Sequence, residues 1–256
     1  MAETCLAAQL YTVREFIKTP EEIAASLKKL AAIGYRAVQL AAVGPIDPRE
    51  LRRILDGEGL TACAAHVSFP RMRDELEAVV EEQEFLGCRS VAVGSMPPEY
   101  RTAEGYPRFA REASEVARRL KERGLTFGYH NHSFELERLD GRTGLEILYS
   151  ESDAAVFNAE IDTYWIQHGG GDPAWWIRRM QGRLPVVHLK DMSIRDGKEQ
   201  LMAEVGEGNL NWPAILEACR EAGVRWYVVE QDHTYERDPF DSLAISLRNL
   251  QAMGLS

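Results

Sequence analysis

Short apolar runs alternate with amphipathic stretches along the chain, and each gap between runs is long enough for one helix. Eight runs have the composition of buried strands: 5–10, 37–41, 61–66, 90–93, 126–130, 156–161, 184–189 and 226–229. Helix-like stretches lie near 20–33, 48–57, 72–86, 104–123, 144–151, 172–181, 212–222 and 240–253. Strands that alternate with helices in this way are parallel and are covered by those helices. The pattern therefore predicts an α/β fold.

Capping residues mark the ends of the predicted helices. A capping side chain precedes a proline at four helix starts: Thr19, Asp47, Asp172 and Asp238. A glycine follows four helix ends, where a left-handed residue is favoured: Gly34, Gly87, Gly124 and Gly223. Because the two signals stand at opposite ends of the predicted elements, they support one another.

Two parallel architectures fit this pattern, a closed (β/α)₈ barrel and an open doubly wound sheet. An open sheet usually has a glycine-rich phosphate turn after its first strand. Here residues 9–14, Gln-Leu-Tyr-Thr-Val-Arg, contain no glycine. The length of 256 residues also matches the ~250 residues typical of a (β/α)₈ barrel. We therefore expect a single TIM-barrel domain over residues 1–256.

The charge and hydropathy of the chain restrict its partners. A net charge of −10 argues against nucleic acid, because proteins that bind a phosphate backbone usually have a basic face. The chain has no apolar run of the ~18 residues that a membrane span needs, and its start lacks the pattern of a signal peptide. We therefore expect a cytoplasmic protein that acts on a small molecule, without a membrane or nucleic-acid partner.

Four candidate metal ligands stand at the ends of successive predicted strands: Glu135, Asp162, His188 and Glu230. They are separated by 27, 26 and 42 residues, or about one strand and one helix per step with a longer final loop. The carboxyl ends of barrel strands meet at one mouth, where catalytic residues gather. Three carboxylates and one imidazole at this mouth suit a divalent metal such as Mn²⁺ or Mg²⁺.

The densest polar cluster of the chain is residues 128–135, Gly-Tyr-His-Asn-His-Ser-Phe-Glu. Buried polar groups need partners, so a cluster of this kind indicates a site. Strand alternation places His130 and His132 on one face, whereas Glu135 falls where the strand should already have ended. Which of these three residues binds the metal stays open.

Alternation also pairs Glu160 with Asp162, and Lys190 with His188, on common strand faces. In that arrangement Glu160 lies one layer deeper and supports a metal ligand, while Lys190 lies further out and holds a substrate oxygen. The alternative is a structural ion pair between Glu160 and Lys190 inside the barrel.

Five segments carry these residues and their neighbours: 129–135, 160–165, 187–191, 204–213 and 229–232. In this order they resemble the sugar phosphate isomerase/epimerase family of the xylose isomerase-like TIM-barrel superfamily. That superfamily also includes inosose dehydratase, ketose 3-epimerases, hydroxypyruvate isomerase and endonuclease IV. The resemblance covers essentially the whole chain but is not specific for a substrate. The endonuclease branch is set aside, because it needs more metal-binding histidines and a DNA-binding face, and this chain is acidic with six histidines.

The resemblance implies one divalent metal, with Mn²⁺ as the first expectation and Mg²⁺, Co²⁺ or Zn²⁺ as alternatives. It implies a Glu–Asp–His–Glu ligand set, which maps onto Glu135, Asp162, His188 and Glu230. It further implies a sugar or keto-polyol substrate and a homodimer or homotetramer. The candidates for substrate contact are Gln9, His66, His132, Trp165, Lys190 and Glu204. The structural alternatives are a capping role for Gln9, a structural His66, loop packing of Trp165 and a turn at Glu204.

The implied reaction removes a proton next to a carbonyl through a metal-bound enediolate. Glu135 and Glu230 are the expected proton-transfer groups, with His132 or Lys190 as a further acid. Return of the proton makes the protein an isomerase or epimerase. Loss of a β-hydroxyl makes it a dehydratase of the inosose dehydratase type. A non-catalytic sugar-binding barrel is a third alternative, against which the retention of all four candidate ligands argues.

Overall fold

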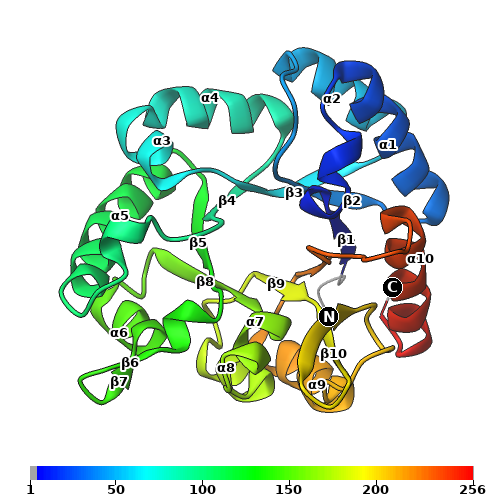
Figure 1. Ribbon diagram of the computed structural model, residues 1–256. Helices are drawn as coiled ribbons and strands as arrows, with labels where there is room; N and C mark the ends of the chain where they lie inside the picture. Colours follow the sequence, from blue (N-terminus) through cyan, green and yellow to red (C-terminus); the bar gives the residue numbers. More distant parts are fainter. Residues whose placement is uncertain (1–4, 256) are drawn as a thin grey trace.

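The computed structural model describes residues 5–255, and its centre is a closed barrel of eight parallel strands (Figure 1). The strands follow the chain around the barrel: β1 (Cys5–Gln9), β2 (Ala37–Leu40), β3 (Thr61–His66), β4 (Ser90–Val93), β5 (Thr126–His130), β8 (Phe157–Asp162), β9 (Val186–Leu189) and β12 (Trp226–Val229). The barrel closes where β1 pairs in parallel with β12. The predicted (β/α)₈ architecture is confirmed.

The main helices lie outside the strands and surround the barrel (Figure 1). They are α1 (Pro20–Ile33), α2 (Pro48–Gly57), α3 (Phe69–Asp74), α4 (Leu76–Leu86), α5 (Gly105–Glu122), α6 (Gly144–Glu151), α7 (Thr163–His168), α8 (Pro173–Arg179), α9 (Trp212–Ala222) and α10 (Pro239–Ala252). Short 3₁₀ turns are η1 (Leu10–Phe16), η2 (Pro98–Tyr100) and η3 (Phe134–Leu136). None of the helices within residues 5–255 has both the length and the apolar character needed to cross a membrane.

The predicted caps lie at the observed helix ends. Thr19 forms a capping box with Glu22 at the start of α1, and Asp47, Asp172 and Asp238 each accept from a backbone N–H of the helix that follows. Gly87 and Gly223 end α4 and α9 in the left-handed conformation, which residues with a Cβ rarely adopt. The predicted helix 72–86 is interrupted at Glu75, whose φ of −124° separates α3 from α4.

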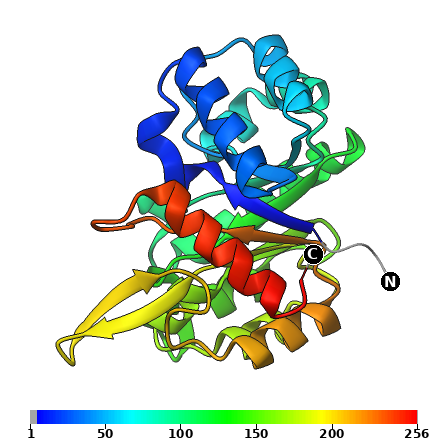
Figure 2. The same ribbon diagram turned by 90° about the vertical axis from the view of Figure 1, so that its right-hand side faces the viewer.

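Two antiparallel hairpins outside the barrel depart from the expectation of a purely alternating chain. They are β6 (Arg138–Leu139) with β7 (Arg142–Thr143), and β10 (Asp191–Arg195) with β11 (Glu199–Ala203). The second hairpin projects from the body of the molecule (Figure 2) and accounts for the long step between His188 and Glu230. Both turns contain an Asp-Gly pair with positive φ, at 140–141 and 196–197, which is a hairpin signal that the sequence carried.

Small side chains fill the deeper part of the barrel interior. Ala7, Ala37, Cys63, Ala64, Val186 and Val228 form a buried cluster there. Because side chains alternate along a strand, residues two positions later on the same strands also point inward, at the carboxyl end. Gln39, His66, His188 and Glu230 occupy these positions, so the strand register carries the polar residues to one mouth.

Candidate metal and substrate site

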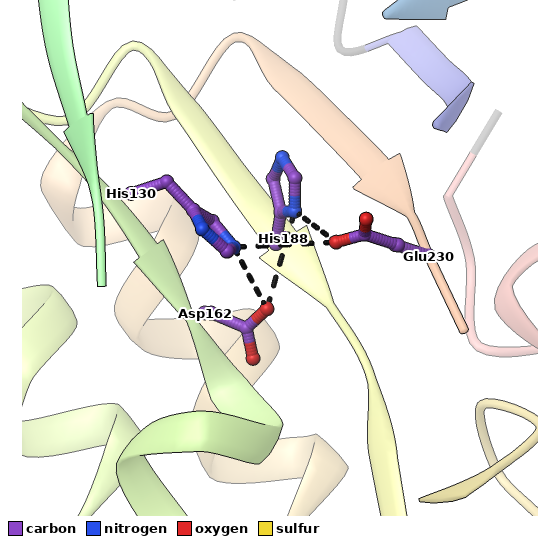
Figure 3. A group of neighbouring side chains, drawn as sticks. All are labelled: His130, Asp162, His188 and Glu230. Carbon is purple, nitrogen blue, oxygen red and sulfur yellow. Dashed lines mark hydrogen bonds and ion pairs between the residues drawn. The ribbon is translucent and has the colours of Figure 1, made fainter. Parts of the chain in front are cut away.

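Four side chains converge at this mouth: His130, Asp162, His188 and Glu230 (Figure 3). They come from the ends of neighbouring strands β5, β8, β9 and β12, and all are at most 5 % exposed. Three of them are predicted metal ligands. The fourth, His130, is one of the three residues of the 128–135 cluster between which the sequence did not decide.

The four ligand atoms are close enough together for one metal ion. His130 Nε2 lies 3.0 Å from Asp162 Oδ2, and His188 Nδ1 lies 2.8 Å from Glu230 Oε2. His130 Nε2 is 4.0 Å from Glu230 Oε2, and His188 Nδ1 is 4.0 Å from Asp162 Oδ2. Bonds of about 2.0–2.2 Å to one ion put neighbouring ligand atoms roughly 3 Å apart and opposite ones roughly 4 Å apart. The donor set therefore fits a divalent metal.

In each of the two imidazoles, the nitrogen that does not face the ligand cluster has a hydrogen-bond partner of its own. His130 Nδ1 donates to the Gly94 carbonyl at 3.0 Å, which leaves Nε2 free to ligate. His188 Nε2 lies 2.9 Å from Glu160 Oε1 and 2.7 Å from Gln39 Oε1. A proton held on Nε2 by these acceptors leaves Nδ1 as the ligating nitrogen, as is usual for metal-bound histidines.

Glu160 is the centre of a deeper polar layer, two residues before Asp162 on β8. Its Oε1 lies 2.6 Å from His66 Nε2 and 3.0 Å from Gln39 Nε2. Burial raises the pKa of Glu160, but the charges of His188 and His66 outweigh burial and hold that pKa well below its usual range. Burial likewise lowers the pKa of His188, but Glu160 and Glu230 raise it to about 10. Glu160 therefore supports His188.

Lys190 is 1 % exposed and its ammonium contacts three carboxylates. Lys190 Nζ lies 2.6 Å from Glu230 Oε2, 3.0 Å from Asp162 Oδ2 and 3.0 Å from Asp232 Oδ1. Burial lowers the pKa of Lys190, but these carboxylates raise it well above its usual range, so the side chain is charged. Since Glu160 pairs with histidines and Lys190 with other acids, the structure does not contain the alternative Glu160–Lys190 ion pair.

A cavity of about 480 Å³ opens onto this cluster, a volume typical of small-molecule sites. Four of the six predicted substrate-contact residues line it: His66, His132, Trp165 and Lys190. The His132 and Trp165 rings lie 5.3 Å apart, between centroids, and form an aromatic wall. Burial lowers the pKa of His132 to about 3, so its imidazole is neutral near pH 7.

The other two predicted substrate contacts, Gln9 and Glu204, do not line this cavity. Gln9 is fully buried, and its side-chain oxygen accepts from the Tyr11 N–H at 3.4 Å. Glu204 accepts a hydrogen bond of 2.7 Å from the Ser242 hydroxyl and pairs with Arg237 at 3.1 Å. Glu204 lines a separate cavity, next to the 230–238 loop. In this structure Gln9 thus caps the η1 turn, and Glu204 contacts α10 and the loop before it.

Glu135 lies outside the four-residue ligand cluster in this structure. Its carboxylate accepts from the Tyr129 hydroxyl at 2.6 Å and from the His132 N–H at 2.8 Å, within the turn that includes η3. Burial raises the pKa of Glu135 to about 8, although both hydrogen bonds favour the ionised form. These contacts make Glu135 a support for the loop that carries His132.

Asp232 is a site residue that the sequence analysis did not single out. It lines the cavity, and both its carboxylate oxygens accept from Lys190, at 3.0 and 3.2 Å. The available signal was its place in the sequence, because Asp232 stands two residues after Glu230, directly beyond the end of β12. Arg14 was also missed; it donates to the Asp232 backbone carbonyl at 2.9 Å.

Comparison with known proteins agrees with this fold. The family model described as xylose isomerase-like TIM barrel matches residues 27–253. The chain belongs to this family. A solved structure of a sugar phosphate isomerase/epimerase from Parabacteroides distasonis superimposes with a TM-score of 0.85 at 21 % identity, covering 100 % of this chain and 96 % of the other.

Two curated relatives align over most of the chain. The rhizopine catabolism protein MocC of Rhizobium meliloti is 26 % identical over 83 % of this chain and 74 % of the relative. An inosose dehydratase of Lacticaseibacillus casei is 24 % identical over 84 % of this chain and 82 % of the relative. The family resemblance predicted from the sequence is thus confirmed.

Proposed function

We propose that this chain is a divalent-metal-dependent isomerase or epimerase of a sugar or keto-polyol. It removes a proton from the carbon next to a carbonyl and returns it to the substrate. The observation that carries the proposal is that Glu230 belongs to the ligand cluster and also lines the cavity, beside Lys190. A carboxylate base and an ammonium group thus face the same small-molecule space as the metal ligands.

The ligands that we assign to the metal are His130, Asp162, His188 and Glu230. A divalent cation held by them would polarise the substrate carbonyl as a Lewis acid. The two imidazoles of the set suit Zn²⁺ or Co²⁺, and its two carboxylates suit Mn²⁺, whereas Mg²⁺ prefers a set made of oxygen ligands alone.

Glu230 is the group that we assign to proton removal. Burial raises the pKa of Glu230, but Lys190 and His188 outweigh burial and hold it well below the usual range. The carboxylate is therefore ionised at neutral pH and can accept a proton. Lys190, 2.6 Å from Glu230 Oε2, can donate to a substrate oxygen whose negative charge grows as the proton leaves.

The remaining cavity residues bind the substrate. Trp165 offers an apolar ring face, and the neutral His132 imidazole can exchange hydrogen bonds with hydroxyl groups. Glu135 remains the sequence-based candidate for a second proton-transfer group. Lys190 has the stronger structural support for that role, because it lines the cavity and Glu135 does not.

Dehydration of a keto-polyol is the second candidate reaction. Two observations favour it: the named inosose dehydratases among the relatives, and the position of Lys190 beside the base, where it can protonate a departing hydroxyl. Both reactions begin with the same proton removal by Glu230, and they differ only in the fate of the β-hydroxyl.

The test is proton exchange on a panel of keto-sugars and inososes, with protein loaded with Mn²⁺ in D₂O. We expect deuterium at the carbon next to the carbonyl, and we expect Glu230→Gln to slow its incorporation by about 10²–10⁴-fold. Asp241→Asn, a change at an exposed acid, is the matched control and should exchange at the wild-type rate. The products separate isomerase from dehydratase. A wild-type protein that exchanges no substrate in the panel would favour a sugar-binding barrel instead.

A further inference from the structure

The Lys190 ammonium bonds to the same carboxylate oxygens that face the proposed metal. Asp162 Oδ2 and Glu230 Oε2 are ligand atoms of the four-residue cluster. Lys190 Nζ lies 3.0 Å from the first and 2.6 Å from the second. A divalent cation and this ammonium group therefore share two anionic partners, and their like charges repel at this separation.

Asp232 is the third partner of Lys190, and it stands apart from the ligand cluster. It binds the ammonium through both oxygens, at 3.0 and 3.2 Å, and none of its atoms belongs to the group of ligand atoms. Its side chain is 15 % exposed, against 4 % or less for those of Asp162 and Glu230. Asp232 is therefore able to hold Lys190 on the cavity side while the other two acids bind metal.

We propose that Asp232 is a positioning residue that lets a charged lysine and a divalent metal occupy this site together. When Asp162 and Glu230 ligate the metal, Lys190 keeps its bidentate contact with Asp232 and presents its remaining donor to the substrate. The inference rests on the metal site of the proposed function. It adds an acidic residue, outside the four-residue ligand set, on which metal affinity depends through Lys190.

The three contacts of Lys190 with acids predict a specific coupling between Lys190 and Asp232. Without Asp232, the ammonium has only the metal-binding carboxylates as partners and competes with the metal for them. Without Lys190, there is no competing cation, and Asp232 has little left to do for the metal. An acid that acted only by adding negative charge would instead strengthen metal binding equally with or without the lysine.

Mn²⁺ titration by calorimetry of four full-length proteins tests this coupling: wild type, Asp232→Asn, Lys190→Met and the double variant. We expect Asp232→Asn to weaken Mn²⁺ binding by about tenfold or more, as for partners outside a ligand set. Lys190→Met should bind Mn²⁺ more tightly than wild type. In the Lys190→Met background, Asp232→Asn should change the affinity by less than about threefold. An equal loss in both backgrounds, or weaker binding by Lys190→Met, overturns the proposal.

Three controls make the outcome specific. Asp232→Glu keeps the carboxylate and should restore most of the affinity, whereas Asp241→Asn removes an exposed charge and should leave affinity unchanged. Thermal unfolding of each variant without metal shows whether it is folded, and Lys190→Gln replaces Lys190→Met if the latter is not.

A wild-type protein that binds no Mn²⁺ refutes the metal site of the proposed function. Wild-type binding with additive variants refutes only the role of Asp232.

Discussion

Glu160 Oε1 lies 2.9 Å from Nε2 of His188, on the side of the ring away from the ligand cluster. The contact joins neighbouring strands β8 and β9, whose register pairs Glu160 with Val186 and Asp162 with His188. The carboxylate therefore sits one layer below the ring that it orients. Nδ1 of this ring faces the cluster, and a proton that the carboxylate holds on Nε2 would leave Nδ1 to ligate a metal.

Glu160→Gln should therefore weaken metal binding without removing a ligand. The amide can accept only through one oxygen and carries no charge, so it holds the His188 tautomer less firmly. Partners of this kind typically contribute 10–100-fold in metal affinity, and we expect a loss in that range by Mn²⁺ titration. Unchanged affinity would mean that Gln39, 2.7 Å from the same nitrogen, orients the ring alone.

His130 and Glu135 compete for one place in the ligand set, and a pair of variants separates them. We expect His130→Ala to weaken Mn²⁺ binding by more than about 100-fold, because a direct ligand contributes more than a supporting partner. Glu135→Gln should bind within about threefold of wild type, since its contacts are with Tyr129 and the His132 N–H. Asp162→Ala is the reference, because it removes a ligand under either assignment. The reverse ranking of the first two variants would restore Glu135 as the ligand.

Glu135 should also make stability fall as pH rises. Its pKa is raised by burial to about 8 in the folded protein, so the folded state holds a proton that the unfolded state releases near pH 4.5. The contribution of Glu135 therefore favours the folded state most at pH values below about 4.5. This contribution to stability is lost progressively as the pH rises from about 4.5 to 8. Glu135→Gln keeps a neutral side chain at every pH. We expect its free energy of unfolding in urea to fall less than that of wild type between pH 5 and 8, and parallel curves would contradict the assignment.

Asp191 should stabilise the segment that follows the β10–β11 hairpin. Its buried carboxylate accepts from five donors: the N–H groups of Met192, Gly206, Gly208 and Leu210, and the indole of Trp212. Asp191→Ala leaves these donors without their acceptor. At about 1–3 kcal/mol for each buried group left unpaired, we expect a loss of at least about 3 kcal/mol in chemical unfolding.

Gly208 offers a second test of the same segment. A Cβ at this position would lie 2.4 Å from Asp191 Oδ1, so Gly208→Ala should also destabilise the protein, by about 1–3 kcal/mol. Gly57→Ala is the matched control, because no atom lies within 4 Å of a Cβ there and α2 ends at this residue. It should be neutral or slightly stabilising. Equal effects at the two glycines would show that the close contact with Asp191 does not govern stability.

Much of the fold is local in origin, and the sequence predicted it for that reason. A capping side chain such as Thr19 or a terminal glycine such as Gly87 acts on its own helix, and strand alternation needs only the neighbouring residues. The hairpin at 191–203 was missed, even though its Asp-Gly turn is a local signal, because the α/β pattern led us to expect only parallel strands.

For the site, the sequence by itself determined which residues stand at the strand ends. Asp162, His188 and Glu230 follow from alternation and spacing, because the strand direction dictates where each side chain points. Only the tertiary structure places His130, and not Glu135, within the group of neighbouring ligand atoms. The chain leaves β5 after His130, and the Glu135 carboxylate then accepts from the Tyr129 hydroxyl and from the His132 N–H. The tertiary structure also decided the partners of Lys190. Its long side chain, directly after the end of β9, reaches Asp162 on one side and Asp232 on the other, and contacts between neighbouring strand ends depend on how the barrel closes.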